Sequence, residues 1–296
     1  MIFLKNISLL FNVIMKIQKL IIYPVKSLMG ISLSTVQIHK RGLEDDRRWM
    51  LTDDKGIFIS QRSYPVLSRI QVALNEANLV FTNLNDPENS LKVRAIPLEK
   101  GPLIDVKVWR STCKAIPVSK IADEWFSKFI NKACRLVYMP DTSKRLVNQK
   151  YASETDIVSF ADGYPLLAIG EASLADLNER LDSPVMMDRF RPNIVFSGGA
   201  PFDEDDWDQI QINGLSFRGI KPCSRCVMVT VDPSTGVINN AEPLKTLATY
   251  RKREKGVYFG MNIIWQHQLH DNSTGQAISV GDKIEVKSRM DEIIFS

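Results

Sequence analysis

The chain of 296 residues is 44% hydrophobic and 24% charged, which is typical of a soluble globular protein and excludes a disordered one. Its length fits one large domain or two ordinary ones, each able to bury a core. With 38 basic and 34 acidic residues the net charge is only +4, and the sequence has no block of basic residues, so nucleic-acid binding is not expected.

Residues 1–20 are apolar but are interrupted by lysine and asparagine residues. A membrane-spanning helix needs about 20 mostly apolar residues, and a signal peptide needs a small-residue cleavage site, so the stretch fits neither pattern well. We therefore expect translation to begin at Met15, which makes residues 1–14 a dispensable extension. An interfacial anchor is the alternative, and no stable membrane span is expected.

Short runs rich in Ile, Val and Thr predict strands from residue 17 onward. Two hairpins are expected, one turning at residues 53–56 and the other at 75–78. Further strands are predicted by five later segments, which are residues 104–118, 165–170, 191–199, 208–220 and 281–286. Consecutive parallel strand–helix alternation, a G-x-G-x-x-G pattern and a P-loop do not occur, so a Rossmann fold is not expected.

Two segments predict packing helices. Residues 121–133 place apolar side chains four positions apart, beginning at Ile121, which predicts an amphipathic helix with this buried stripe. In residues 171–181, Ser173 and Asp176 predict a capping box at the start of the helix. The predicted class is α+β and rich in strands.

The acidic segment DEDDWDQ, residues 203–209, carries oxygen ligands that hard cations prefer. It lacks the regular spacing of a calcium loop, so we expect a solvated acidic loop.

The four cysteines stand at positions 113, 134, 223 and 226 and are too few for a disulfide scaffold. Their small number indicates free thiols in a reducing compartment, so we expect a cytoplasmic location. Cys223 and Cys226 form a C-x-x-C pair in the segment KPCSRCVMVTVDP, residues 221–233. Three kinds of functional site are possible for this pair. A fourth possibility is that both cysteines are buried and inert.

A structural zinc site needs four nitrogen or sulfur ligands. The other two cysteines do not form a second C-x-x-C pair, so the missing ligands would be His267 and His270. A redox dithiol normally begins a helix whose dipole lowers the thiol pKa, whereas residues 227–231 here predict a strand.

The third possibility is a loop that enters this strand and presents one thiolate to a soft metal or a reactive ligand. Lys221 and Arg225 flank the thiols and favour the ionised form. Pro222 stiffens the approach to the pair, and residues 232–236 predict a turn after the strand.

Several ordered motifs resemble those of MOSC-domain proteins with an N-terminal β-barrel domain. The motifs are KPCSRCVMVTVDPSTG, EPLKTLATYR and FGMN in the C-terminal half, and YPVKSLMG, DDRRWML and FISQRSYPVLSRI in the N-terminal half. The resemblance spans residues 15–286 and is greatest to bacterial YcbX-type proteins and to the mitochondrial amidoxime-reducing component. It implies a β-barrel domain at 15–139, a linker at 140–156 and a MOSC-type β-barrel domain with packing helices at 157–290.

The resemblance implies a molybdenum cofactor of the molybdopterin type, bound between the two domains. Its metal ligand would be Cys226, the second cysteine of the C-S-R-C segment, and a thiolate suits a soft metal site. Cys223 would be a neighbour and no ligand, while Ser224 and Arg225 would touch the cofactor.

The same resemblance implies donors for the pterin phosphate. A guanidinium and an ammonium make a chemically sensible clamp for it. The implied cofactor-binding residues are Lys26, Ser27, Arg47, Arg191, Asn193 and Asn262.

Asp162 matches an acidic position near the metal of the reductases and is implied to orient substrate or relay a proton. The mitochondrial relatives have hydroxyl residues just after this aspartate, whereas this chain has Gly163 and Tyr164. The substrate contacts on that side therefore do not carry over.

The implied activity is a molybdenum-dependent oxidoreductase that reduces N-hydroxylated compounds of the amidoxime or N-hydroxy base type by oxygen-atom transfer. The chain lacks the extra cysteines of an iron–sulfur domain, so a separate ferredoxin or flavin reductase would supply electrons. The alternative is a carrier of molybdenum cofactor or sulfur, with a persulfide on Cys226, and a zinc-stabilised or metal-free binding module is a third possibility. Pyridoxal phosphate is associated with the family through cofactor sulfurases, but nothing here matches their pyridoxal-phosphate domain, so direct binding is not expected.

Overall fold

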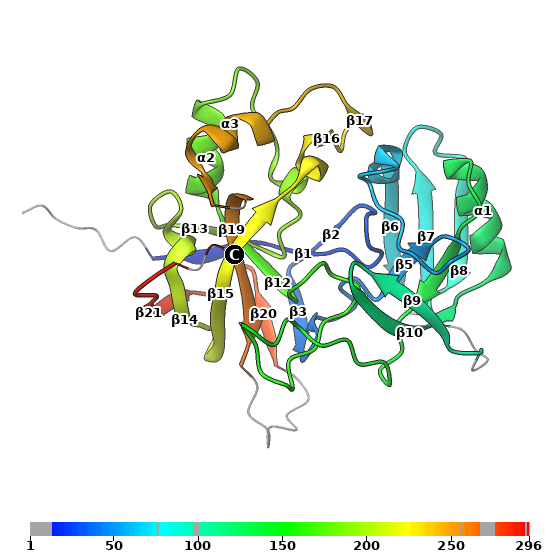
Figure 1. Ribbon diagram of the computed structural model, residues 1–296, viewed down its shortest axis with the longest axis horizontal. Coiled ribbons are helices and arrows are strands. Elements are labelled where there is room, and N and C mark those ends of the chain that lie inside the picture. Colours follow the sequence, from blue (N-terminus) through cyan, green and yellow to red (C-terminus); the bar gives the residue numbers. More distant parts are fainter. Residues whose placement is uncertain are drawn as a thin grey trace, which may run out of the picture.

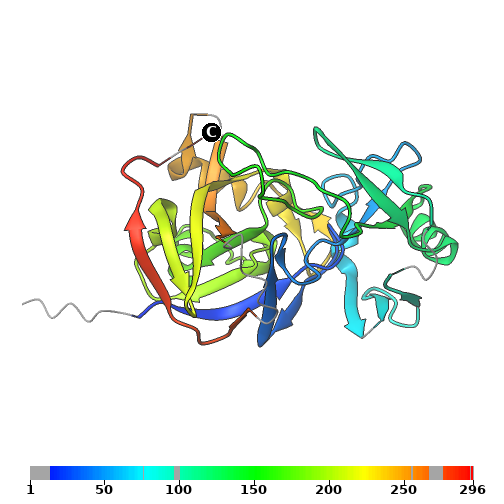
Figure 2. The ribbon, with the colours of Figure 1, turned by 90° about the horizontal axis from the view of Figure 1, so that it is seen from below.

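The structure is a computed structural model that describes residues 14–75, 77–96, 101–254, 256–266, 276–293 and 295. The extension predicted at residues 1–14 lies almost wholly outside the described residues, as do His267 and His270. Two strand-rich lobes lie side by side, a larger one formed mainly by the C-terminal half and a smaller one formed mainly by residues 49–139 (Figures 1 and 2).

The larger lobe is built on a long mixed sheet. In the described part of the chain its strands run in the order β2 (Ile31–Leu33), β1 (Lys16–Ile22), β13 (Ile194–Ser197), β12 (Leu166–Gly170), β19 (Gly256–Trp265), β15 (Leu215–Arg225), β14 (Trp207–Ile212) and β21 (Ile284–Arg289), with β18 (Lys252–Arg253) beside β19. Every residue of the central strand β12 is buried. The strands β12 and β13 pair in parallel and are joined by α2 (Glu171–Glu179), and the other pairs in this order are antiparallel.

Smaller elements complete this lobe. They are the sheet of β20 (Ala277–Ser279), β3 (Thr35–His39) and β4 (Gly42–Leu43), the pair β16 (Val231–Asp232) and β17 (Val237–Ile238), the helix α3 (Leu244–Tyr250), and the 3-10 turns η2 (Met187–Phe190), η3 (Asp203–Asp206) and η4 (Val227–Thr230).

The smaller lobe contains two further sheets and one flanking helix. Its strands are β5 (Trp49–Thr52), β11 (Arg135–Tyr138), β10 (Ser111–Pro117) and β9 (Ile104–Val108) in one sheet, and β6 (Ile70–Asn75), β7 (Asn78–Asn83) and β8 (Ser90–Arg94) in the other, with η1 (Pro65–Arg69) before β6. The helix α1 (Lys120–Ile130) lies on the outer side of this lobe (Figure 1). Its core is centred on Trp49, Phe81 and Phe126.

The chain crosses between the lobes near its N-terminus. Strand β1 pairs with β13 of the larger lobe and, after the loop of residues 23–30, with β2, and the chain enters the smaller lobe at β5 only after β3 and β4. The two halves of the sequence therefore contribute strands to one sheet. The domain boundaries given above remain predictions, and the segment between the end of β1 and β5 lies where the lobes meet.

The α+β, strand-rich class and both hairpins are confirmed. Asp53 O accepts from Gly56 N at the first turn, and β6 pairs with β7 in the register Asn75 to Asn78 at the second. The sequence predicts the strand-rich class because the signals are local. Apolar residues alternate along each strand, and turn residues lie between the strands.

The predicted helix faces were wrong in detail. In α1 the buried residues are Ala122, Phe126 and Ile130, whereas Ile121 is 65% exposed. The true stripe is displaced by one residue because Phe126, rather than its neighbour Trp125, fills the interior of the lobe. The capping box of α2 is also absent, since Gly170 is the N-cap and has no side chain to bond the first turn.

Residues 227–231 do not form the predicted strand. Strand β15 ends at Arg225, and residues 227–230 form the 3-10 turn η4, with only β16 following. Val229 N donates to Cys226 O at 3.2 Å, and the Thr230 hydroxyl donates to Val227 O at 2.7 Å. This side-chain bond within the turn compensates for the weak helical preference of the β-branched run.

The acidic segment 203–209 is not a solvated loop. Glu204 is fully buried and Asp205 is 6% exposed. Both oxygens of Glu204 accept from the Ser173 hydroxyl at 2.9 Å, and one accepts from Gly170 N at 3.1 Å. Burial raises the pKa of Glu204 to about 7, with a smaller contribution from the charge of Asp205. Among the described residues no cluster of His, Cys, Asp or Glu fits a metal ion.

We expect Glu204→Gln to change how stability depends on pH. The folded-state pKa of about 7 lies above the ordinary 4.5, so the folded protein holds a proton that the unfolded chain releases. The contribution of Glu204 is present below about pH 4.5 and is lost as pH rises through 7. Urea unfolding should show the variant gaining up to about 3 kcal/mol over the wild type between pH 5 and pH 8. The exposed Glu171→Gln is the control, and a difference that is equal at both pH values contradicts the prediction.

Candidate functional site

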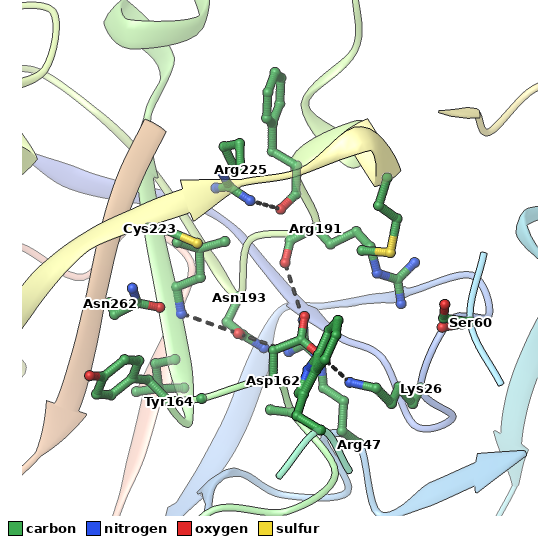
Figure 3. A pocket seen from close by; sticks show the side chains of 18 of the residues that line it. Lys26, Arg47, Ser60, Asp162, Tyr164, Arg191, Asn193, Cys223, Arg225 and Asn262 are labelled. Atoms are coloured by element: carbon green, nitrogen blue, oxygen red, sulfur yellow. Dashed lines mark hydrogen bonds and ion pairs between the residues drawn. The ribbon is translucent and has the colours of Figure 1, made fainter. Parts of the chain in front are cut away.

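A pocket of about 720 Å³, counting the open solvent at its mouth, lies where the two lobes meet (Figure 3). Its lining includes Lys26, Ser27, Arg47, Phe58, Ser60, Arg62 and Trp109 from the N-terminal half of the chain, and Asp162, Tyr164, Phe190, Arg191, Asn193, Cys223, Arg225, Met228 and Asn262 from the C-terminal half.

Four lining residues have a left-handed backbone. The φ angles are 72° at Ser27, 50° at Arg47, 56° at Trp109 and 54° at Arg191, and none of these residues is glycine. Such conformations cost about 1–3 kcal/mol each and persist where the surrounding structure enforces them, often at functional sites. The strain therefore gathers in the loops that present the cationic side chains.

Tyr23 contacts two of these cations. The guanidinium carbon of Arg47 lies 4.4 Å from the ring centre, and that of Arg191 lies 4.1 Å from it. The Tyr23 hydroxyl donates to Pro192 O at 3.2 Å, and burial raises its pKa to about 12 although both arginines oppose the shift. The neutral ring is attracted to both guanidinium groups, so it keeps two like charges close together.

Asn193 is a junction within the protein. Its Oδ1 accepts from Arg47 at 2.9 Å and from Leu167 N at 3.3 Å, and its Nδ2 donates to Ile21 O at 3.1 Å. The residue is 1% exposed. Its side chain is therefore engaged in orienting Arg47 and in joining β1 to the start of β12.

Lys26 and Asp162 form an ion pair of 2.5 Å across the lobes. Lys26 Nζ also donates to Phe160 O at 2.9 Å, and Trp109 Nε1 donates to the same Asp162 oxygen at 2.9 Å. An ammonium has three N–H donors and the described residues accept two of them, so one remains for a ligand.

The pKa values of Lys26 and Asp162 are both lowered. Burial lowers the pKa of Lys26, and the Asp162 carboxylate partly offsets this. The Asp162 side chain is 58% exposed toward the pocket mouth, and enclosure by the walls acts to raise its pKa. The charge and hydrogen bond of Lys26, and the bond from Trp109, outweigh this and lower the pKa of Asp162. Asp162 is therefore an anion at neutral pH and a poor proton donor.

Strand β15 brings Cys223 and Arg225 to the pocket, as Figure 3 shows. Arg225 donates from Nε to Phe259 O at 2.8 Å and from NH1 to Phe190 O at 3.0 Å. On the neighbouring β19, Asn262 Nδ2 donates to Lys221 O at 3.1 Å.

Two predicted site residues are outside the pocket lining. Ser224 is exposed, and its hydroxyl lies beside Gly256. Cys226 is exposed at the mouth, where NH2 of Arg62 lies 3.7 Å from its sulfur. Cys223 is partly buried, and burial raises the pKa of its thiol. The alternative of two buried, inert cysteines is therefore wrong for Cys226.

The unpartnered donors of the pocket fit an anionic ligand. Among the described residues, NH2 of Arg191, NH2 of Arg225 and Nε of Arg62 are buried without an acceptor. Leaving such groups unpaired costs about 1–3 kcal/mol each, more for charged ones, so an anion that reaches them gains this energy back. The lining holds five cationic side chains and one carboxylate, and a phosphate-bearing cofactor fits this donor set.

Sequence reasoning missed four residues that shape the site. Tyr23, Arg62 and Trp109 act through stacking, and Arg145 donates to Ser159 O, Ala161 O and Asp162 O at 2.6–2.8 Å. The first three stand inside or beside strand-like segments, where aromatic and basic residues are ordinary. No local pattern could have separated them from core or surface positions.

Comparison with known proteins agrees with this architecture. The MOSC N-terminal beta barrel domain matches residues 14–133, and the MOSC domain matches residues 155–285. The chain belongs to the MOSC-domain proteins that carry an N-terminal MOSC β-barrel domain.

The relatives of this MOSC protein include reductase components. It is 31% identical over 280 residues to mitochondrial amidoxime-reducing component 1 of Mus musculus, covering 90% of this chain and 81% of the relative. It is 32% identical over 253 residues to mitochondrial amidoxime reducing component 2 of Bos taurus, covering 82% and 75%. It is 29% identical to the molybdenum cofactor sulfurase of Oryza sativa subsp. japonica, covering 90% of this chain and 35% of that protein. These relatives support a protein related to the molybdenum cofactor.

Among the residues that the structure describes, no helix is long and apolar enough to cross a membrane.

We expect Tyr23→Leu to weaken anion binding in the pocket of this MOSC protein. The change removes the ring that both Arg47 and Arg191 contact, and two such contacts are worth about 1–2 kcal/mol together. Calorimetric titration with inorganic phosphate should show an affinity about tenfold lower. Tyr23→Phe keeps the ring and is the matched control. A Tyr23→Leu protein that is folded, by circular dichroism, and binds phosphate like the wild type would exclude this role.

Proposed function

We propose that this MOSC protein is a molybdenum-dependent oxidoreductase that reduces N-hydroxylated compounds such as amidoximes. The observation that carries the proposal is the pocket between the lobes, which combines unpartnered guanidinium donors, a charged Asp162 and an exposed cysteine at its mouth. The similarity to amidoxime-reducing components supports the substrate class.

In the reaction the N–O bond of the substrate breaks, two electrons and two protons are consumed, and an amidine and water are formed. The molybdenum cofactor supplies two-electron oxygen-atom transfer when bound. The electrons come from a separate protein of the ferredoxin or flavin reductase type. The cytoplasmic location inferred from the cysteines stays a prediction.

The cationic side chains of the pocket would hold the phosphate of this cofactor. Arg191 and Arg225 offer N–H groups without an acceptor, Arg47 is fixed by Asn193, and Lys26 keeps one free donor. Ser27 lies next to Lys26 in the strained loop, and Asn262 lines the opposite wall. Ser224 contacts the cofactor less directly in this proposal, because it stands outside the lining.

Cys226 is the proposed metal ligand. Its thiol is exposed and lies beside Arg62 of the other lobe, so it can reach a ligand that fills the mouth. Cys223 lines the pocket wall and is partly buried, so it is proposed as a neighbour of the metal ligand.

Asp162 is proposed to accept a hydrogen bond from the substrate amino group. Its lowered pKa suits an acceptor that stays ionised, and it makes a proton relay from this carboxyl group less suitable at neutral pH.

A carrier of molybdenum cofactor or sulfur is the second candidate, because the exposed Cys226 thiol beside a guanidinium can also hold a persulfide and the rice relative is named a cofactor sulfurase. Stoichiometric molybdenum with turnover of benzamidoxime by a reduced dye favours the reductase. A labile persulfide without turnover favours the carrier. Pyridoxal phosphate has no part in either proposal.

We expect Cys226→Ser to lose activity and most of its molybdenum, because a hydroxyl is a far poorer ligand for a soft metal. Molybdenum and pterin analysis should be made on protein from a host that synthesises the cofactor. Cys223→Ser is the matched control and should keep its molybdenum. Loss in Cys223→Ser alone would transfer the ligand role to the cysteine that lines the pocket, and full activity in both variants would refute a cysteine ligand.

We expect Asp162→Asn to lower kcat/KM for benzamidoxime about 10- to 100-fold while the molybdenum content is retained. A hydrogen bond to a charged group is worth about 1.5–3 kcal/mol, which corresponds to this range. The exposed Asp54→Asn serves as the control. Unchanged kcat/KM in the Asp162 variant would remove this residue from substrate binding.

A further inference from the structure

Two residues of the smaller lobe, Arg62 and Trp109, stand at the mouth of the pocket. The guanidinium carbon of Arg62 lies 4.5 Å from the centre of the Trp109 ring, and its NH2 lies 3.7 Å from the sulfur of Cys226. Trp109 in turn donates to Asp162. The pair therefore lies between the proposed metal ligand and the proposed substrate acceptor, and both residues belong to the pocket lining.

Arg62 has no carboxylate partner in the part of the chain that the structure describes. Lys26 is paired with Asp162 and Arg47 with Asp46, whereas among the described residues no carboxylate pairs with Arg62, and it shares this with Arg191 and Arg225. Its Nε finds no acceptor in that part of the chain either. Arg62 is held by stacking, which leaves its charge uncompensated at the pocket mouth.

Trp109 provides an aromatic wall next to this charge. It is 41% exposed, and its ring centre lies 4.9 Å from that of Phe58, which also lines the pocket. Its backbone φ of 56° is strained for a bulky residue, and the hydrogen bond to Asp162 fixes the ring in place. An exposed aromatic surface held in this way suits a flat, unsaturated ligand.

The charge balance favours an anion here even after a cofactor is bound. The lining carries five cationic side chains and one carboxylate, and a phosphate dianion offsets only part of the difference. Arg225 and Arg191 leave donors unsatisfied deeper in the pocket, whereas Arg62 adjoins Cys226 at the mouth. A second anionic group, on the substrate, therefore has a cation available at the pocket mouth.

We propose that Arg62 and Trp109 form a substrate-selecting site that prefers flat N-hydroxylated compounds bearing a carboxylate. The guanidinium of Arg62 binds the carboxylate, and Trp109 and Phe58 pack against the ring. This rests on the proposed reductase function and names its substrate class. The amidine product is a strong base and carries a positive charge at neutral pH, so the same surplus of cations favours its release.

The test compares 4-carboxybenzamidoxime with benzamidoxime in the cofactor-loaded protein and in Arg62→Gln. The wild type should have the higher kcat/KM for the carboxylated compound. In Arg62→Gln the ratio of the two kcat/KM values should fall about tenfold, since one partly exposed charge-assisted hydrogen bond is lost. The change should appear in KM, because the carboxylate is remote from the N–O bond and is bound equally in the ground and transition states.

A binding measurement gives a readout that is independent of turnover. Calorimetric titration of 4-carboxybenzamidoxime into cofactor-loaded protein without reductant should show an affinity about tenfold lower in Arg62→Gln, and Arg62→Lys should recover part of it. Trp109→Ala should weaken both compounds alike, while Trp109→Phe keeps an aromatic wall. Arg110→Gln, an exposed neighbour outside the pocket lining, is the control and should leave the substrate ratio unchanged.

The outcomes separate the two proposals. If the wild type does not reduce benzamidoxime, the reductase proposal fails, and the titration still reports whether Arg62 selects a carboxylate. If the wild type turns over both compounds and Arg62→Gln leaves their ratio unchanged, the selection proposal is overturned. Loss of molybdenum from Arg62→Gln also overturns it, because Arg62 then belongs to the cofactor site.

Discussion

The buried contact among Asp46, Arg47 and Asn193 is the interaction on which the site depends. Asp46 is almost fully buried, accepts from Tyr23 N at 2.8 Å and forms an ion pair of 2.6 Å with Arg47. Burial raises the pKa of Asp46, and Arg47 opposes this shift most strongly. Removing one member of such a pair costs about 3–5 kcal/mol, because the other charge stays buried alone. The contact therefore fixes the end of β1, the loop before β5 and the start of β13 to one another at the junction of the lobes.

This arrangement concentrates positive charge in a place where water alone does not compensate it well. Burial lowers the pKa of Arg191 to about 10, which measures how much its charge is disfavoured there. The Tyr23 ring lessens the repulsion between Arg47 and Arg191 without neutralising either. A ligand that carries a phosphate relieves the remaining cost, so its binding stabilises the folded protein as well as filling the pocket. The strained loops therefore present the cationic side chains that make the anion site.

The sequence predicts the local features of this structure but not the features that depend on tertiary contacts. The hairpins at 53–56 and 75–78 depend on residues that are neighbours in the chain, so the sequence predicts them. The face of α1 depended on whether Trp125 or Phe126 enters the core, which the spacing of apolar residues does not decide. The burial of Glu204 depends on Ser173 and Gly170, about thirty positions away, and an acidic run looks alike in both environments. The motifs identify most of the proposed site residues that line the pocket. The stacking roles of Tyr23 and Arg62 depend on contacts between residues far apart in the sequence, so no motif predicts them.

The 3-10 turn η4 explains how two cysteines three positions apart acquire different surroundings. Successive side chains of a strand point to opposite faces, so Cys223 and Arg225 share the face that lines the pocket. A strand continued through residue 226 would direct that side chain to the other face, away from Arg225. Because β15 ends at Arg225 and the chain turns at η4, Cys226 instead meets Arg62 of the smaller lobe. The β-branched run after the cysteines forms a tight turn, and this turn places a thiol at the opening between the lobes while its neighbour remains in the wall.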